Sequence, residues 1–101
     1  MAKIVDQVNA LTNGYVRHGG KDNRRQQRAR MLDFAEHCAA MGVREVGQIG
    51  GRHVISWWHS HQALSEATLY AHWLAIRELW RLAQLRGDPP KPRGGVAVRC
   101  V

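Results

Sequence analysis

Apolar residues recur every three or four positions in four stretches of this chain, the spacing typical of amphipathic helices. The first helix is predicted over residues 3–15, with four apolar residues on one face: Ile4, Val8, Leu11 and Tyr15. The pair Gly19-Gly20 then breaks the periodicity. No stretch alternates apolar and polar residues for long enough to predict a strand. The pattern therefore predicts an all-α fold.

The second helix is predicted to begin after Asp22 or Asn23, either of which is a suitable N-cap, and to end at Gly42. Its inner face carries Met31, Phe34, Cys38 and Met41. A connector over residues 43–51 follows, in which Val46 and Ile49 are expected to fill core positions. The third helix is predicted over residues 52–61, with its apolar face formed by Val54, Trp57 and Trp58. Trp58 lies about a quarter turn from Trp57 and is the tryptophan expected to be exposed.

The fourth helix has the clearest boundaries in the sequence. Ser65 is a good N-cap, and Leu64 and Leu69 occupy the positions of a hydrophobic staple. A buried stripe is predicted from Leu69, Trp73, Ile76, Trp80 and Ala83. Gly87, followed by two prolines, is expected to stop the helix. We therefore predict one domain over residues 1–87 and a flexible basic tail or linker stub over residues 88–101.

Charge changes this picture from a generic helical domain to a candidate nucleic-acid binder. The 101 residues include 15 Lys and Arg against 8 Asp and Glu, which leaves a net charge of +7. Arginine dominates this set and favours a partner that offers phosphates. No apolar run approaches the roughly 20 residues of a membrane-spanning helix, and the start lacks the apolar core of a signal peptide. We expect a cytoplasmic protein with no membrane partner, in which Cys38 and Cys100 are reduced.

The strongest candidate site is the basic start of the second helix. Its cationic residues are Lys21, Arg24, Arg25, Arg28 and Arg30, with Asn23, Gln26 and Gln27 between them. Helical geometry is expected to turn Arg25 and Arg28 away from the inner-face residues Phe34 and Cys38, toward solvent or a partner. Arginines can clamp phosphates, and amides can read base edges. The alternative is a solvated charged face.

The remaining chemistry-bearing residues predict no catalytic or metal site. Four histidines gather at His53, His59, His61 and His72, but their spacing does not complete a tetrahedral set, and we expect polar surface histidines. No nucleophile, paired-carboxylate or phosphate-loop arrangement stands out. We therefore expect no enzyme activity, no cofactor and no small-molecule substrate. Trp57, Trp73 and Trp80 are expected in the core rather than on a base-stacking surface.

The order of these parts resembles a known family. The basic helix leads to Met31-Leu32-Asp33-Phe34, the connector holds Val46-Gly47-Gln48-Ile49, and the last helix runs from Leu64-Ser65-Glu66 through Ala75-Ile76-Arg77-Glu78 to Gly87. Over about residues 3–92 the chain resembles the N-terminal core-binding domain of tyrosine recombinases and phage integrases. The resemblance implies a SAM-like domain of four orthogonally packed helices, which forms one jaw of a clamp around duplex DNA. Its second and fourth helices would cross the major groove.

Carried onto this sequence, the resemblance implies DNA contacts on two helices. Together with the basic residues they give one set of candidate DNA-binding residues: Lys21, Arg24, Arg25, Gln26, Arg28, Ala29, Arg52, Thr68, Tyr70, Ala71, His72 and Arg77. Ala67 and Ala75 are expected to complete an outward row with Ala71. The catalytic domain of the family has no counterpart in this chain. We therefore expect either an accessory or regulatory protein of a mobile element or a fragment of a larger recombinase, and a recombinase or another protein of the same element is the expected protein partner.

Two other functions fit the same residues. A helix-turn-helix regulator would use the fourth helix for recognition and depend on Thr68, Tyr70 and His72. A protein-interaction module would dock through the first helix or an exposed aromatic edge at Trp58, with the charge serving solubility.

Overall fold

The computed structural model describes residues 3–14 and 21–92, and in these ranges the chain is all-α, as predicted. The helices are α1 (Lys3–Asn13), α2 (Lys21–Ala40), α3 (Gly51–Ser60) and α4 (Glu66–Leu82), with a short 3-10 helix η2 (Val46–Gln48) between α2 and α3. No residue of the described ranges forms a strand. Tyr15, expected on the first helix, lies outside the described residues.

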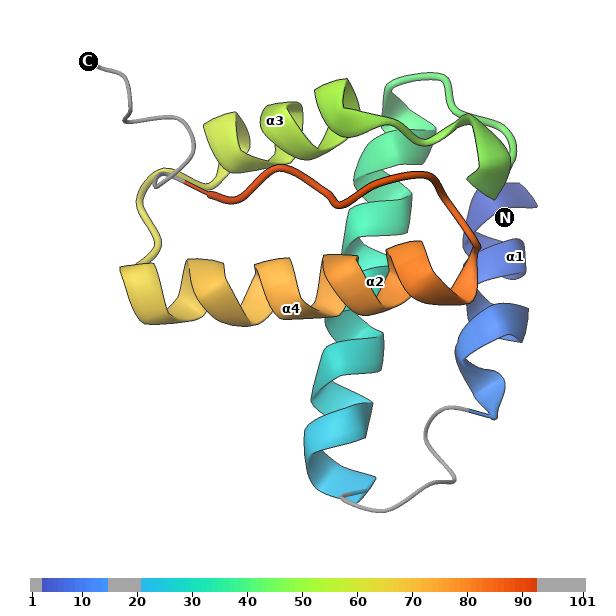
Figure 1. Ribbon diagram of the computed structural model, residues 1–101, viewed down its shortest axis with the longest axis horizontal. Helices are drawn as coiled ribbons and strands as arrows, with labels where there is room; N and C mark the ends of the chain where they lie inside the picture. The colour runs from blue at the N-terminus through green and yellow to red at the C-terminus, as the bar shows by residue number, and fades with distance from the viewer. Residues whose placement is uncertain (1–2, 15–20, 93–101) are drawn as a thin grey trace.

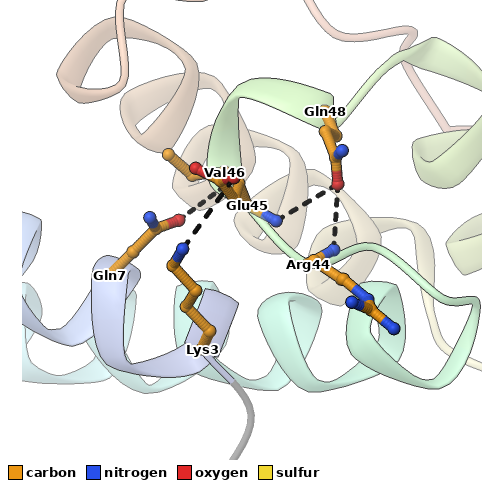
Figure 2. A network of polar contacts seen from close by, with 6 residues as sticks. All are labelled: Lys3, Gln7, Arg44, Glu45, Val46 and Gln48. Carbon is orange, nitrogen blue, oxygen red and sulfur yellow. Dashed lines mark hydrogen bonds and ion pairs between the residues drawn. The ribbon is translucent and has the colours of Figure 1, made fainter.

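α2 is the central helix of the fold. In Figure 1, α4 crosses α2, α1 lies along it, and α3 lies on the same side of the molecule as the C-terminal end of α2. The contacts bury Phe34 from α2 and Ile76 from α4 completely, and Trp57, Trp73 and Trp80 are almost fully buried. The expected core position of these three tryptophans is confirmed. Figure 2 shows how α1 also holds η2: Val46 N donates to Gln7 Oε1 at 2.7 Å, and Lys3 pairs with Glu45 at 3.8 Å.

The end of α2 follows from one glycine. Gly42 adopts a positive φ of 94°, and its N–H and that of Val43 donate to the carbonyls of Ala39 and Cys38, each at 3.0 Å. This arrangement satisfies the last carbonyls of the helix and confirms the predicted stop. Met41 therefore lies outside the helix and is 43% exposed, so its expected place on the inner face was wrong. The helix also begins at Lys21, before both residues that we expected to cap it.

The two ends of α4 differ in how well local sequence predicts them. At the start, Ser65 Oγ accepts from the N–H of Thr68 at 3.2 Å, which confirms the predicted N-cap. At the other end the helix stops before Gly87. Gln84 adopts a left-handed φ of 57°, and the N–H of Leu85 donates to the carbonyl of Trp80 at 3.0 Å. A glutamine thus occupies a backbone conformation that glycine adopts at less cost.

Residues 86–92, here called the C-terminal segment, run back between α3 and α4 (Figure 1). Three indole N–H groups hold them: Trp80 donates to the carbonyl of Arg86, Trp73 to that of Pro89 and Trp58 to that of Pro90, at 3.0, 3.1 and 3.0 Å. Pro89 is buried. The predicted tail from residue 88 is thus packed on the domain as far as residue 92, and residues 93–101 lie outside the described residues. Trp58, expected to be exposed, is only 4% exposed because this segment covers it.

Candidate nucleic-acid interface

The first half of α2 extends past its crossing with α4 (Figure 1), and it carries the basic residues of the predicted interface. Arg25, Gln26 and Ala29 are exposed, and Arg24 is partly exposed. Lys21 is the first residue of α2, and its side chain lies outside the described residues. Six of the predicted contact residues thus belong to the first half of one helix, and Arg28 is the sixth.

Arg28 does not face outward, contrary to our expectation. Its Nε donates to Thr12 Oγ1 at 3.0 Å, and its Nη2 contacts both the carbonyl and the side-chain oxygen of Asn9. The reason is helical register, because Arg28 precedes the fully buried Met31 by three residues and Ala35 by seven. Judging its direction against Phe34 and Cys38 alone therefore gave the wrong face. Arg28 joins α2 to α1.

Arg30 is also held within the domain. Its Nη1 donates to Oε1 of Gln27 at 2.9 Å, and Gln27 is only 8% exposed. Burial and, after it, the positive charge of Arg30 lower the pKa of His72 on α4, so Arg30 lies near this histidine. The basic start of α2 is therefore divided into arginines that fasten the helix to its neighbours and arginines, chiefly Arg25, that remain available to a partner.

On α4 the structure rearranges the predicted contact row. Ala67 is exposed and Ala71 half-buried, but Ala75 is completely buried, so the expected outward row of alanines does not exist. Thr68 is engaged in the N-cap, where its Oγ1 accepts from Ser65 Oγ at 2.9 Å. The exposed face of α4 instead carries Tyr70 and Arg77, two turns apart.

Tyr70 and Arg77 belong to an aromatic and cationic cluster around Trp73. The rings of Tyr70 and Trp73 lie 5.7 Å apart between centroids, with an interplanar angle of 32°. The guanidinium carbon of Arg77 is 5.0 Å from the centroid of the Trp73 ring, and Nζ of Lys91 is 5.2 Å from it. Both distances are typical of cation–π contacts. We call Tyr70, Trp73, Arg77 and Lys91 the Trp73 cluster.

Sequence reasoning missed Lys91 because it assigned this residue to the tail. Its only local signal was a lysine between two prolines, which says nothing about where the segment packs. The hydrogen bond from Trp73 to Pro89 returns the chain to α4 and so brings Lys91 over the indole ring. The Trp73 cluster thus combines residues on one face of α4 with a lysine of the C-terminal segment.

Three cations of this candidate interface have no acidic partner among the described residues. Among the described residues, ion pairs join Lys3 to Glu45 and Arg81 to Glu78, and neither Arg25, Arg77 nor Lys91 has a carboxylate within ion-pair distance. Their charge is therefore available to attract an anionic partner.

Three histidines pack around the ring of Trp57. The rings of His37, His61 and His72 lie 5.3, 3.8 and 5.5 Å from the Trp57 ring, measured between centroids. Nδ1 of His72 is buried without a hydrogen-bond partner, and burial lowers the pKa of both His37 and His72. Only His59 is fully exposed among the four histidines that we expected at the surface; His53 is 3% exposed. The described residues include no group of three or more potential ligands placed to hold a metal ion.

Arg52 is separated from the other candidates. It lies in the first turn of α3, beside Met41 and Val43 at the C-terminal end of α2. Arg25 lies near the opposite end of α2, a helix of 20 residues and so about 30 Å long. Arg52 and the first half of α2 therefore do not belong to one continuous contact surface.

The described helices include none that is long and apolar enough to cross a membrane. Searches against protein-family models, curated proteins and solved structures found no match to this chain.

Proposed function

We propose that this chain is a non-catalytic DNA-binding domain, similar to the core-binding domain of tyrosine recombinases, that binds duplex DNA through the first half of α2 and the exposed face of α4. The observation that carries the proposal is the presence of exposed cations without acidic partners on both helices, Arg25 on α2 and Arg77 with Lys91 at the Trp73 cluster. A net charge of +7 adds a general attraction to nucleic acid.

The neighbours of these cations suit contact with DNA. Gln26 is exposed beside Arg25 and can form paired hydrogen bonds with an adenine edge. Ala29, one turn later, is exposed and small enough to let the backbone of α2 approach the duplex. Tyr70 is 55% exposed and offers both a ring and a hydroxyl at the Trp73 cluster. Phosphate contacts would supply most of the affinity, and the polar side chains any sequence preference.

Helix-turn-helix recognition and docking through Trp58 have less support. Helix-turn-helix recognition would need Thr68 and His72 free to reach bases, but Thr68 is bonded in the N-cap and His72 packs against Trp57. An interaction module docking at Trp58 would need an exposed ring there, and the C-terminal segment covers it.

The test is the salt dependence of binding to a labelled duplex, followed by fluorescence anisotropy between about 50 and 200 mM salt. Neutralising about five phosphates predicts a slope of log affinity against log salt of roughly −4 to −5. The double variant Arg25→Ala, Arg77→Ala should lower the magnitude of this slope by about 2. Arg44→Ala, Arg86→Ala is the matched control, because it removes the same charge from two exposed arginines outside the proposed interface. A flat salt response, or equal losses in both double variants, would contradict the proposal.

A further inference from the structure

A cavity lies between the C-terminal end of α2 and the start of α3, away from the proposed DNA interface. It has a volume of about 470 Å³ and is lined by Met41, Gly42, Val43, Gln48, Arg52 and His53. This volume is within the range of about 300–1,000 Å³ that is usual for small-molecule sites. No aspartate or glutamate lines it.

His53 lines this cavity and has one ring nitrogen that is not used in a hydrogen bond with the described residues. The side chain is 3% exposed, and its Nδ1 accepts a hydrogen bond from the N–H of Gly50 at 2.9 Å. Nδ1 is therefore unprotonated, and the proton of the neutral ring is on Nε2. Burial, followed by the charge of Arg52, lowers the pKa of His53 and so favours the neutral ring. Nε2–H has no partner among the described residues and is not sealed from solvent.

Gln48, like His53, has a hydrogen-bond donor that is not used within the described part of the protein. Its Oε1 accepts from the N–H groups of Arg44 and Glu45, at 3.0 and 3.2 Å (Figure 2). With the oxygen engaged, the amide NH₂ of Gln48 is left to donate. On the α2 side, the carbonyls of Cys38 and Ala39 already accept hydrogen bonds from residues 43 and 42. The polar side chains of the cavity therefore offer donors.

Arg52 adds a full positive charge to these donors. Its side chain is exposed, and it has no acidic partner within ion-pair distance in the described part of the chain. It stands in the first turn of α3, whose N-terminal N–H groups and helix dipole also favour an anion.

We propose that this cavity is a phosphate-binding site, in which Arg52, Nε2–H of His53 and the amide of Gln48 hold the phosphate oxygens. This site is separate from the proposed DNA interface, since the cavity is at the other end of α2 from Arg25. The phosphate can belong to a small phosphorylated molecule or to a nucleic-acid backbone, and both offer the same tetrahedral oxygens to the three donors.

The experiment is an NMR titration of the ¹⁵N-labelled full chain with inorganic phosphate, with total ionic strength held constant by sodium chloride. We expect saturable shifts of the amides of Gln48, Arg52 and His53, together with a shift of the His53 Nε2 resonance. Arg52→Gln should weaken binding at least about tenfold, because it removes a charge-assisted hydrogen bond. The matched control is Arg44→Gln, an exposed arginine of the neighbouring loop that does not line the cavity; it should leave the affinity unchanged.

Non-saturating shifts, shifts spread over all basic residues, or equal weakening in both variants would overturn the proposal, because each indicates general charge screening. A second titration, with an unlabelled duplex, identifies the source of the phosphate. Cavity shifts that saturating phosphate abolishes support a backbone phosphate. If inorganic phosphate binds but the duplex does not shift the cavity resonances, the natural ligand is a small phosphorylated molecule.

Discussion

Arg28→Ala and Arg25→Ala are expected to have opposite effects although the two residues are neighbours on the same helix. Arg28 bonds to Thr12 and Asn9 on α1, and Thr12 is completely buried, with its hydroxyl donating to the carbonyl of Val8 at 2.8 Å. Arg25 is exposed and has no acidic partner among the described residues. Arg28 should therefore stabilise the fold, and Arg25 should serve binding.

The magnitude follows from the contacts that each substitution removes. A hydrogen bond to a charged group contributes about 1.5–3 kcal/mol, and the half-exposed position of Arg28 reduces the sum of its bonds to about 2 kcal/mol. For a domain of this size that loss lowers the melting temperature by about 8–16 °C. Arg25→Ala should change the free energy of unfolding by less than about 0.5 kcal/mol and lower the magnitude of the salt slope for duplex binding by about 1.

Thermal unfolding and duplex anisotropy, measured on the same preparations, separate the two roles. Arg28→Lys is the useful control, because it keeps the charge but cannot reproduce the contacts of the planar guanidinium group with Thr12 and Asn9. It should be destabilised nearly as much as Arg28→Ala while binding DNA with an unchanged salt slope. If Arg28→Ala melts like the wild type and binds DNA as weakly as Arg25→Ala, the attachment of α1 through Arg28 is refuted.

Three further predictions concern stability and reactivity. Gln84→Gly should raise the free energy of unfolding by about 1 kcal/mol in urea denaturation, because glycine removes the cost of the left-handed backbone; a lower stability would contradict this. Stability should fall as pH decreases below about 6.5, since the lowered pKa values of His37 and His72 mean that the unfolded chain binds more protons; melting curves should show this loss, and His72→Gln should reduce it. Burial raises the pKa of Cys38 to about 12, so a thiol reagent at neutral pH should label Cys38 only after denaturation; rapid labelling of the folded chain would disprove its burial.

Local sequence was sufficient for the features that depend on neighbouring residues. The N-cap of α4 needs only a hydrogen bond from the N–H of Thr68 to the hydroxyl of Ser65, three residues earlier. The end of α2 needs only one residue with positive φ, Gly42. The apolar periodicity likewise predicted the four helices and the burial of Trp57, Trp73 and Trp80, because each helix must turn its apolar face inward.

Tertiary packing decided the features on which the candidate sites depend. Nothing near Lys91 in the sequence indicates that the chain returns along α4. The indole N–H groups of Trp58 and Trp73 hold the returning segment, and their acceptors in Pro90 and Pro89 lie 32 and 16 positions away in the sequence. The sequence pattern alone placed Arg28 on the wrong face of its helix. A packed helix buries a sector of its circumference, and the position of α1 decides which basic residues at the edge of that sector are covered. Likewise, the cavity that contains His53 and Arg52 exists only because the end of α2 meets the start of α3. Such contacts join residues distant in sequence, and their free energy depends on geometry that no local pattern contains.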